Sequence, residues 1–197
     1  LHLLRSNDIV LRDMALQTLR AMRQGGIWDQ LAGGIHRYST DRHWLVPHFE
    51  KMLYDQALVA YVALEAYQLT NDNQYCDMAE NLLEFTLQEL TSPQGGFYCG
   101  LDADSEAREG ACYVWRRQEL DALLGADAAL FCERYGVTNE GNFEVAGENV
   151  LYQAQTIEAL SKAHNRPETE LAERLDHCVQ ALLAVRRQRE QPLRDLK

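Results

Sequence analysis

The sequence lacks the features that would point to a membrane or a nucleic acid. No apolar run reaches the roughly 18 residues that a membrane-spanning helix needs. The 19 Lys and Arg residues are outnumbered by 30 Asp and Glu residues, giving a formal net charge of -11. No basic stretch alternates with aromatic residues. Because nucleic acids and anionic membranes repel such a chain, we expect neither as a partner.

Cysteine motifs and phosphate-binding motifs are also missing. The five cysteines include no Cys-x-x-Cys pair, which argues against a disulfide framework or a zinc site and favours the reducing cytoplasm as the location. There is no Gly-x-Ser-x-Gly nucleophile elbow and no P-loop. The sequence therefore predicts no cofactor and gives no support to nucleophilic catalysis.

Hydrophobic periodicity predicts helices joined by long, glycine-containing loops. The helix expected over residues 49–69 is apolar on every face, which is typical of a helix enclosed by others. Asp72 can cap the next helix, which is amphipathic and runs to about residue 90, so an inner helix followed by an outer one is expected. Further helices are predicted over residues 3–22, 118–124, 127–135 and 156–164, and from Pro167 through Val185.

Two glycine-turned segments and an acidic turn indicate how these helices are connected. One pattern occurs twice: two glycines follow a helix and are themselves followed by large apolar or aromatic residues, in Gly25-Gly26-Ile27-Trp28 and in Gly95-Gly96-Phe97-Tyr98. Such a repeat is typical of stacked helical hairpins. The aromatic runs at 97–100 and 111–115 flank an acidic turn and are expected to pair as a β-hairpin. We therefore predict an all-α fold, an α/α toroid of about three helical hairpins with a short β-hairpin.

The densest polar cluster lies between Gly33 and Asp55. A helix beginning near Pro47 would place His48, Lys51 and Asp55 on one side, with Lys51 and Asp55 paired. We interpret His48 or Glu50 as the group that moves a proton on a polyol or carbonyl substrate, while Asp55, Arg37 and Tyr38 position that substrate. The alternative is structural: His48 and Glu50 cap the helix and hold the long loop, and the ion pair is half-buried.

The acidic turn, Asp102-Ala103-Asp104-Ser105-Glu106, is the second candidate site. Asp102 and Asp104 could serve as acid and base on a glycoside. Carboxylates can also bind a divalent cation, but the turn lacks the full spacing of an EF-hand loop, so no metal is predicted. The alternative is a solvated hairpin tip.

Aromatic and cationic side chains near both motifs are the candidates for binding a substrate. Aromatic faces can stack on sugar rings, although a tryptophan more often packs in a core. Arg37 is expected to pair with Asp102 or Asp104, or to bind an anionic substrate group. The predicted substrate-binding residues are His36, Arg37, Tyr38, Trp44, Tyr98 and Trp115.

Three ordered segments resemble motifs of a known family: GGIWDQLAGGIHRYSTDRHWLVPHFEKMLYDQA, GGFYCGLDADSEAREGACYVW and GNFEVAGENVL. They are similar to thioredoxin-domain-containing proteins that include bacterial YyaL and the mammalian spermatogenesis-associated protein twenty. The resemblance implies an (α/α)6 barrel of the six-hairpin glycosidase class, similar to N-acylglucosamine 2-epimerases, after an N-terminal thioredoxin-like domain. It implies that residues 1–197 form the first half of that barrel, without the thioredoxin-like domain or the second half.

The resemblance thus implies a fragment of a carbohydrate-acting enzyme, an epimerase, isomerase or hydrolase for a sugar or polyol, inactive by itself. The alternative is a non-enzymatic helical module that binds a partner protein alongside a thioredoxin-like domain. Faces that the second half would cover are expected to be apolar, and to be exposed or hidden by self-association.

Overall fold

The computed structural model describes residues 1–195, and this part of the chain is mostly helical. The prediction of a mainly α fold is confirmed, while closure into a toroid stays a prediction. None of the described helices is both long and apolar enough to cross a membrane. The seven α-helices of residues 1–195 are α1 (Ile9–Gln24), α2 (Leu53–Thr70), α3 (Asn73–Glu89), α4 (Arg117–Leu124), α5 (Ala128–Tyr135), α6 (Ile157–His164) and α7 (Glu168–Arg186).

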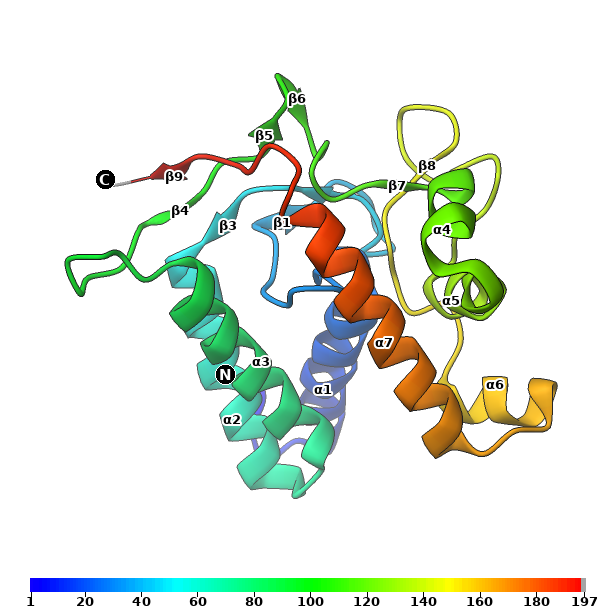
Figure 1. Ribbon diagram of the computed structural model, residues 1–197. Coiled ribbons are helices and arrows are strands. Elements are labelled where there is room, and N and C mark those ends of the chain that lie inside the picture. Colours follow the sequence, from blue (N-terminus) through cyan, green and yellow to red (C-terminus); the bar gives the residue numbers. More distant parts are fainter. Residues whose placement is uncertain (196–197) are drawn as a thin grey trace.

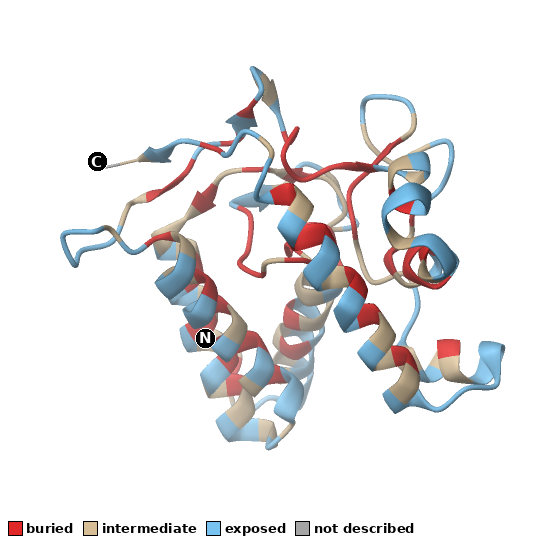
Figure 2. Cartoon of the chain, in the orientation of Figure 1, coloured by how far each residue is buried: buried red, intermediate tan, exposed pale blue. Residues whose placement is uncertain are grey.

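The helices form two groups, and the short strands gather at one end of them (Figure 1). Figure 1 shows α2 and α3 side by side, α7 across from α3, and α1 farther back between that pair and α7. The helices α4, α5 and α6 lie on the far side of α7. Buried residues follow the facing sides of the helices and continue into the loops at the strand-bearing end (Figure 2).

Three of the described helices begin at side-chain caps, and one of these caps, Asp72, was predicted. The Asp72 side chain accepts the N–H of Gln74 at the start of α3, and Thr156 accepts the N–H of Ala159 at the start of α6. The helix predicted from residue 3 begins at Ile9 instead, because Asp8 supplies the cap there.

The prediction of a helix beginning near Pro47 is wrong. Residues 47–52 are extended and contain β2 (Pro47–His48) and β3 (Lys51–Met52), so α2 begins only at Leu53. β2 pairs with β1 (Tyr38–Ser39), and β3 pairs with β4 (Gly100–Leu101). Side chains alternate along extended backbone, so neighbouring residues of this segment face opposite sides.

The acidic turn forms a hairpin, but the flanking aromatic runs do not pair with each other. The hairpin consists of β5 (Asp104–Ser105) and β6 (Arg108–Glu109), joined through two residues with positive φ. The runs on either side find partners distant in sequence: β4 also pairs with β9 (Arg194–Asp195), and β7 (Trp115–Arg116) pairs with β8 (Glu148–Asn149).

The expectation that α2 is enclosed is also wrong within residues 1–195. Its buried side consists of Gln56 and small alanines, whereas Leu58 is 63% exposed and Tyr61 is 46% exposed. The larger buried side chains come from α3, among them Tyr75, Met78, Leu82 and Phe85. The apolar pattern all round α2 therefore does not correspond to burial in this part of the chain.

Candidate functional site

The first motif folds into a polar cluster around His48. Register between β1 and β2 sets Tyr38 opposite His48, and the two rings stack with centroids 4.9 Å apart. The imidazole lies between two carboxylates, with Nδ1 2.7 Å from Oε1 of Glu109 and Nε2 3.0 Å from Oε2 of Glu50. Arg37 donates to the same Glu50 oxygen at 2.6 Å. Arg37 thus pairs with Glu50 and not with Asp102 or Asp104.

Asp55 stands in the first turn of α2 beside this cluster. Its carboxyl is half-buried, and Oδ2 is buried without a hydrogen-bond partner in the described residues. Burial raises the pKa of Asp55 to about 6, against the opposing effect of Arg37 and with a further upward contribution from Glu50. A carboxyl that titrates near neutral pH can both donate and accept a proton in catalysis.

The two predicted motifs meet, but through a residue that was not predicted. Glu109 of the hairpin reaches His48 and also accepts the Phe49 N–H at 3.1 Å. Asp104 lies opposite Glu109 in the hairpin register and is exposed, as is Asp102. Glu50 and Asp102 do line one cavity of about 370 Å³, with Met52, Gly100, Leu101, Leu193, Arg194 and Asp195.

Two of the predicted substrate-binding residues are buried. His36 is 2% exposed, its Nδ1 lies 3.0 Å from the Phe49 carbonyl, and its ring packs edge-on against Phe49 and Tyr113. Burial, reinforced by Lys51, lowers the pKa of His36 to about 3, so this imidazole is neutral at physiological pH. Trp115 is completely buried in the core. Neither side chain is placed to stack on a ligand at the surface.

The other aromatic candidates occupy different positions. Tyr38 is half exposed beside His48, whereas Trp44 packs against the hydrophobic cluster that contains α1 and α2 residues. Tyr98 packs beside Phe85 and Leu101. Of the aromatic candidates, only Tyr38 contacts the His48 cluster directly in the described structure.

The predicted ion pair between Lys51 and Asp55 is wrong. Extended backbone places Lys51 on the other side from Glu50, where Nζ lies 2.6 Å from Oδ2 of Asp29 and donates to the Gly33 carbonyl at 2.8 Å. Arg186 of α7 forms a bidentate pair with the same Asp29 at 2.9 and 2.8 Å. Burial acts to raise the pKa of Asp29, but Arg186 and Lys51 outweigh it and hold the pKa far below its usual range.

The third motif orders the loop between α5 and α6. Asn149 is buried and donates to the carbonyls of Trp115 and Thr138, and Asn142 exchanges hydrogen bonds with the Val150 backbone. Glu148 binds Arg108 and Arg116. These contacts make Asn142, Glu148 and Asn149 loop-ordering residues.

Comparison with known proteins identifies the family of the chain. It is 37% identical to spermatogenesis-associated protein 20 of Homo sapiens over 100% of its length, and 39% identical to the protein of the same name in Mus musculus over 80% of its length. The chain belongs to the spermatogenesis-associated protein 20 family. An uncharacterized protein of Caenorhabditis elegans is 32% identical over 93% of the chain. The chain spans 28% of the human relative and 23% of the mouse relative. No protein-family model matches the sequence.

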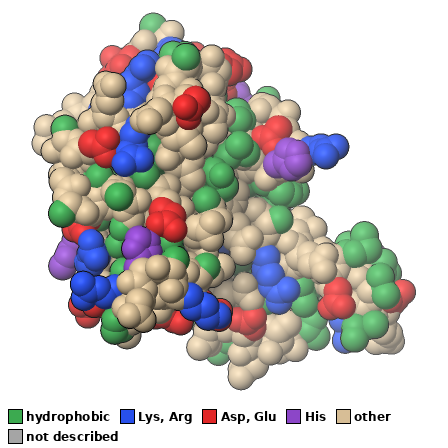
Figure 3. Space-filling model, turned by 90° about the vertical axis from the view of Figure 1, so that its right-hand side faces the viewer, with side chains coloured by type: hydrophobic (Ala, Val, Ile, Leu, Met, Phe, Trp, Pro, Cys, Tyr) green, Lys and Arg blue, Asp and Glu red, His purple; other side chains and the backbone are tan. Residues whose placement is uncertain are grey.

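In this member of the spermatogenesis-associated protein 20 family, charged side chains are dispersed over the face that carries α4, α5 and α6 (Figure 3). Figure 3 shows acidic and basic side chains interspersed there, without a continuous basic patch. Among residues 1–195, no three His, Cys, Asp or Glu side chains are grouped so that they could hold a metal ion.

Three charged residues of the two polar clusters, around His48 and around Lys51, were not predicted: Asp29, Glu109 and Arg186. Each contacts a partner that is distant in the sequence. The separation is 22 residues between Asp29 and Lys51, and 61 residues between Glu109 and His48. Arg186 and Asp29 are 157 residues apart. Only Glu109 had a local signal, because a two-residue hairpin turn places it opposite Asp104.

Proposed function

We propose that this chain supplies the proton-transfer side of an enzyme site for a sugar or polyol, in the epimerase, isomerase or hydrolase class. One observation carries the proposal: the Asp55 carboxyl has a buried, unpartnered Oδ2 and a pKa raised to about 6. A half-buried carboxyl of this kind changes protonation state near neutral pH. Asp55 is therefore the proposed acid or base.

Glu50 is the proposed second carboxylate of this site. Arg37 and His48 both contact its Oε2, which fixes the side chain and balances its charge. Glu50 and Asp102 face a common cavity of about 370 Å³, which is within the size range of small-molecule sites. Tyr38, half exposed and stacked on His48, offers an aromatic face for a sugar ring.

Proton exchange at carbon tests the proposal without requiring complete turnover. Because the resemblance implies that the fragment is inactive by itself, the full-length protein is incubated in D₂O with N-acetyl-D-glucosamine or D-mannose, and loss of the C2 proton signal is followed by NMR. Nitrophenyl glycosides test hydrolysis in parallel. Asp55→Asn and Glu50→Gln are expected to abolish the reaction, whereas Asp13→Asn, an exposed carboxylate on α1, leaves it unchanged. Absence of any reaction, or equal rates in all variants, would reject the proposal.

A second candidate, a non-enzymatic module that binds a protein, is favoured by the exposed side of α2. Tyr54, Leu58 and Tyr61 follow one another at helical spacing and are all exposed. Such a row is typical of a contact surface. Leu58→Lys is expected to reduce partner binding or self-association under this candidate, measured by sedimentation, and to leave the proton-transfer reaction unchanged.

A further inference from the structure

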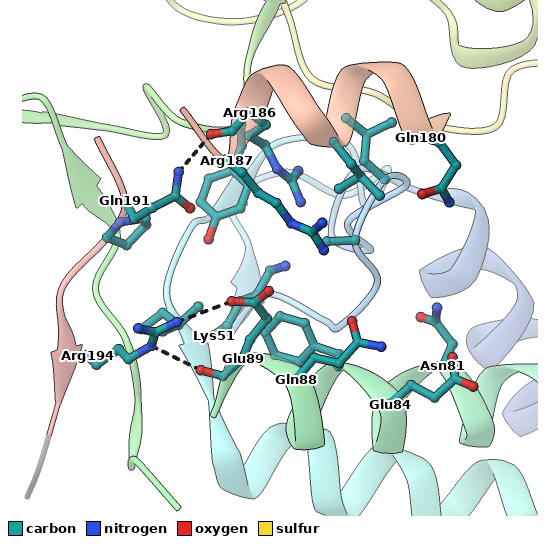
Figure 4. A pocket seen from close by; sticks show the side chains of 17 residues that line it. Lys51, Asn81, Glu84, Gln88, Glu89, Gln180, Arg186, Arg187, Gln191 and Arg194 are labelled. Carbon is teal, nitrogen blue, oxygen red and sulfur yellow. Dashed lines mark hydrogen bonds and ion pairs between the residues drawn. The ribbon is translucent and has the colours of Figure 1, made fainter. Parts of the chain in front are cut away.

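A second cavity of about 370 Å³ lies between α3 and α7, and none of the predicted catalytic residues lines it. In Figure 4, Asn81, Glu84 and Gln88 line the α3 side, while Gln180 and Arg186 line the α7 side. Lys51 lies between these two walls. Because β3 is extended, Lys51 and Glu50 face different cavities. The second cavity is therefore separate from the wall that carries Glu50.

The buried floor of this cavity has more positive than negative charge. Lys51 is 1% exposed and Arg186 is 6% exposed, and both pair with the single carboxylate of Asp29. The neighbouring His36 is neutral, since its pKa is lowered to about 3. One positive charge thus remains without a matching anion in a desolvated place, where an unbalanced charge is costly.

Charges nearer the rim do not remove this excess. Arg194 donates to Glu89, so these two side chains compensate each other. Glu84 and Arg187 are exposed and of opposite sign. The local excess of positive charge contrasts with the formal net charge of -11 for the whole chain.

Tyr113 supplies an unused hydrogen-bond donor at the same floor. The side chain lines the cavity and is only 9% exposed, and its hydroxyl has no hydrogen-bond partner among residues 1–195. Lys51 Nζ lies 5.1 Å, and Arg186 Cζ 5.3 Å, from the centre of its ring. Lys51 uses two of its three N–H donors within the protein, on Asp29 and Gly33.

We infer that this cavity binds a small polar molecule that carries a carboxylate or phosphate group, with the anionic group on Tyr113, Lys51 and Arg186. The amide side chains of Asn81, Gln88 and Gln180 also line the cavity and can form hydrogen bonds with hydroxyl groups on the rest of the ligand. Both anionic groups accept hydrogen bonds from hydroxyl, ammonium and guanidinium donors. The inference does not depend on the proposed role of Asp55.

Calorimetric titration of the chain with D-glucuronate, D-glucose 6-phosphate and neutral D-glucose tests this site. At least one of the two anions is expected to bind at least about tenfold more tightly than glucose, and to bind more weakly as salt is added. The glucuronate and phosphate arms distinguish which anionic group the floor accepts. Failure of both anions to bind, or equal binding of glucose, would overturn the inference.

Tyr113→Phe removes only the hydroxyl and keeps the ring that packs against Phe49 and His36. We expect this variant to bind the preferred anion at least about tenfold more weakly, which corresponds to one lost hydrogen bond to a charged group. Tyr67→Phe, on α2 and outside the cavity lining, is the matched control and should bind like the parent chain. Unchanged affinity in Tyr113→Phe would contradict the assignment even if an anion binds.

Discussion

His48 and Glu109 lie 61 residues apart in the sequence, yet Nδ1 of the histidine is 2.7 Å from Oε1 of the glutamate. The same glutamate oxygen accepts the Phe49 N–H. One carboxylate therefore fastens the acidic hairpin to the loop of the first motif, and Glu50 contacts the other ring nitrogen. The two motifs form a single polar cluster as a result.

Substitutions of Glu109 separate its charge from its role as a backbone acceptor. Glu109→Gln keeps an oxygen for the Phe49 N–H, so we expect a loss of less than about 1 kcal/mol in unfolding free energy, as for other partly exposed ion pairs. Glu109→Ala removes both functions, and a loss of about 1–3 kcal/mol is expected. Urea denaturation measures both values, and equal losses would contradict the acceptor role.

Gly34 and Gly95 form a matched pair for testing the packing of the glycine loop. Both have positive φ, but a Cβ at Gly34 would lie 2.7 Å from the Phe85 ring, whereas a Cβ at Gly95 would meet nothing within 4 Å. Alanine at Gly95 is expected to cost about 1–2 kcal/mol from backbone strain alone. Alanine at Gly34 should cost at least about 1 kcal/mol more, because Phe85 must move. Thermal unfolding showing the reverse order would contradict this packing.

Asp29→Asn tests the buried charge cluster. The substitution leaves Lys51 and Arg186 buried without their shared carboxylate, so the unfolding free energy is expected to fall by about 3–5 kcal/mol. Asp121→Asn removes the partner of Arg117 at the surface and should cost less than about 1 kcal/mol. Chemical denaturation of the two variants measures the contrast, and similar losses would show that the cluster contributes no special stability.

Asp55→Asn is expected to stabilise the chain at pH 7. Because the pKa is raised to about 6 in the folded chain, the native state binds a proton that the unfolded state releases between about pH 4 and pH 6. The unfolding free energy contributed by this group therefore falls as pH rises through that window and is lost above it. At pH 7 the variant should gain on the order of 1 kcal/mol, after allowance for solvent screening of a half-buried group.

The control for this measurement is Asp13→Asn, compared with the parent chain at each pH. His36 acts in the opposite direction, since its lowered pKa makes stability fall as pH drops from about 6.5 towards 3. Only the difference between Asp55→Asn and the parent isolates Asp55. A variant that is less stable than the parent at pH 7 would show that the ionised carboxylate is favourably placed.

Local signals predicted the helices well because capping depends on neighbouring residues. Asp72 caps α3 as expected, and α3 shows the predicted amphipathic burial. Pro47 misled the prediction because proline also suits extended backbone, and here it lies in a two-residue strand. Strands that short carry too few residues to show an alternating pattern.

Part of the polar cluster around His48 was predictable because its members are near neighbours in the sequence. His48, Glu50 and Asp55 stand close together in the sequence, so their association needed little tertiary information. The pairing of Lys51 depends on Asp29 in a separate loop, and Asp29 in turn depends on Arg186 of α7. No local pattern specifies contacts over such separations. The exposure of Leu58 is likewise set by which elements pack against α2.

The titration of Asp55 tests the proposed acid–base role most directly. Carbon-detected NMR of the chain labelled with ¹³C at aspartate carboxyls, with Asp55→Asn used to assign the resonance, gives the pKa of this single group. A midpoint near pH 6 is the predicted result. A midpoint near the ordinary aspartate value of about 3.9 would contradict the proposal that Asp55 is a poised proton-transfer group.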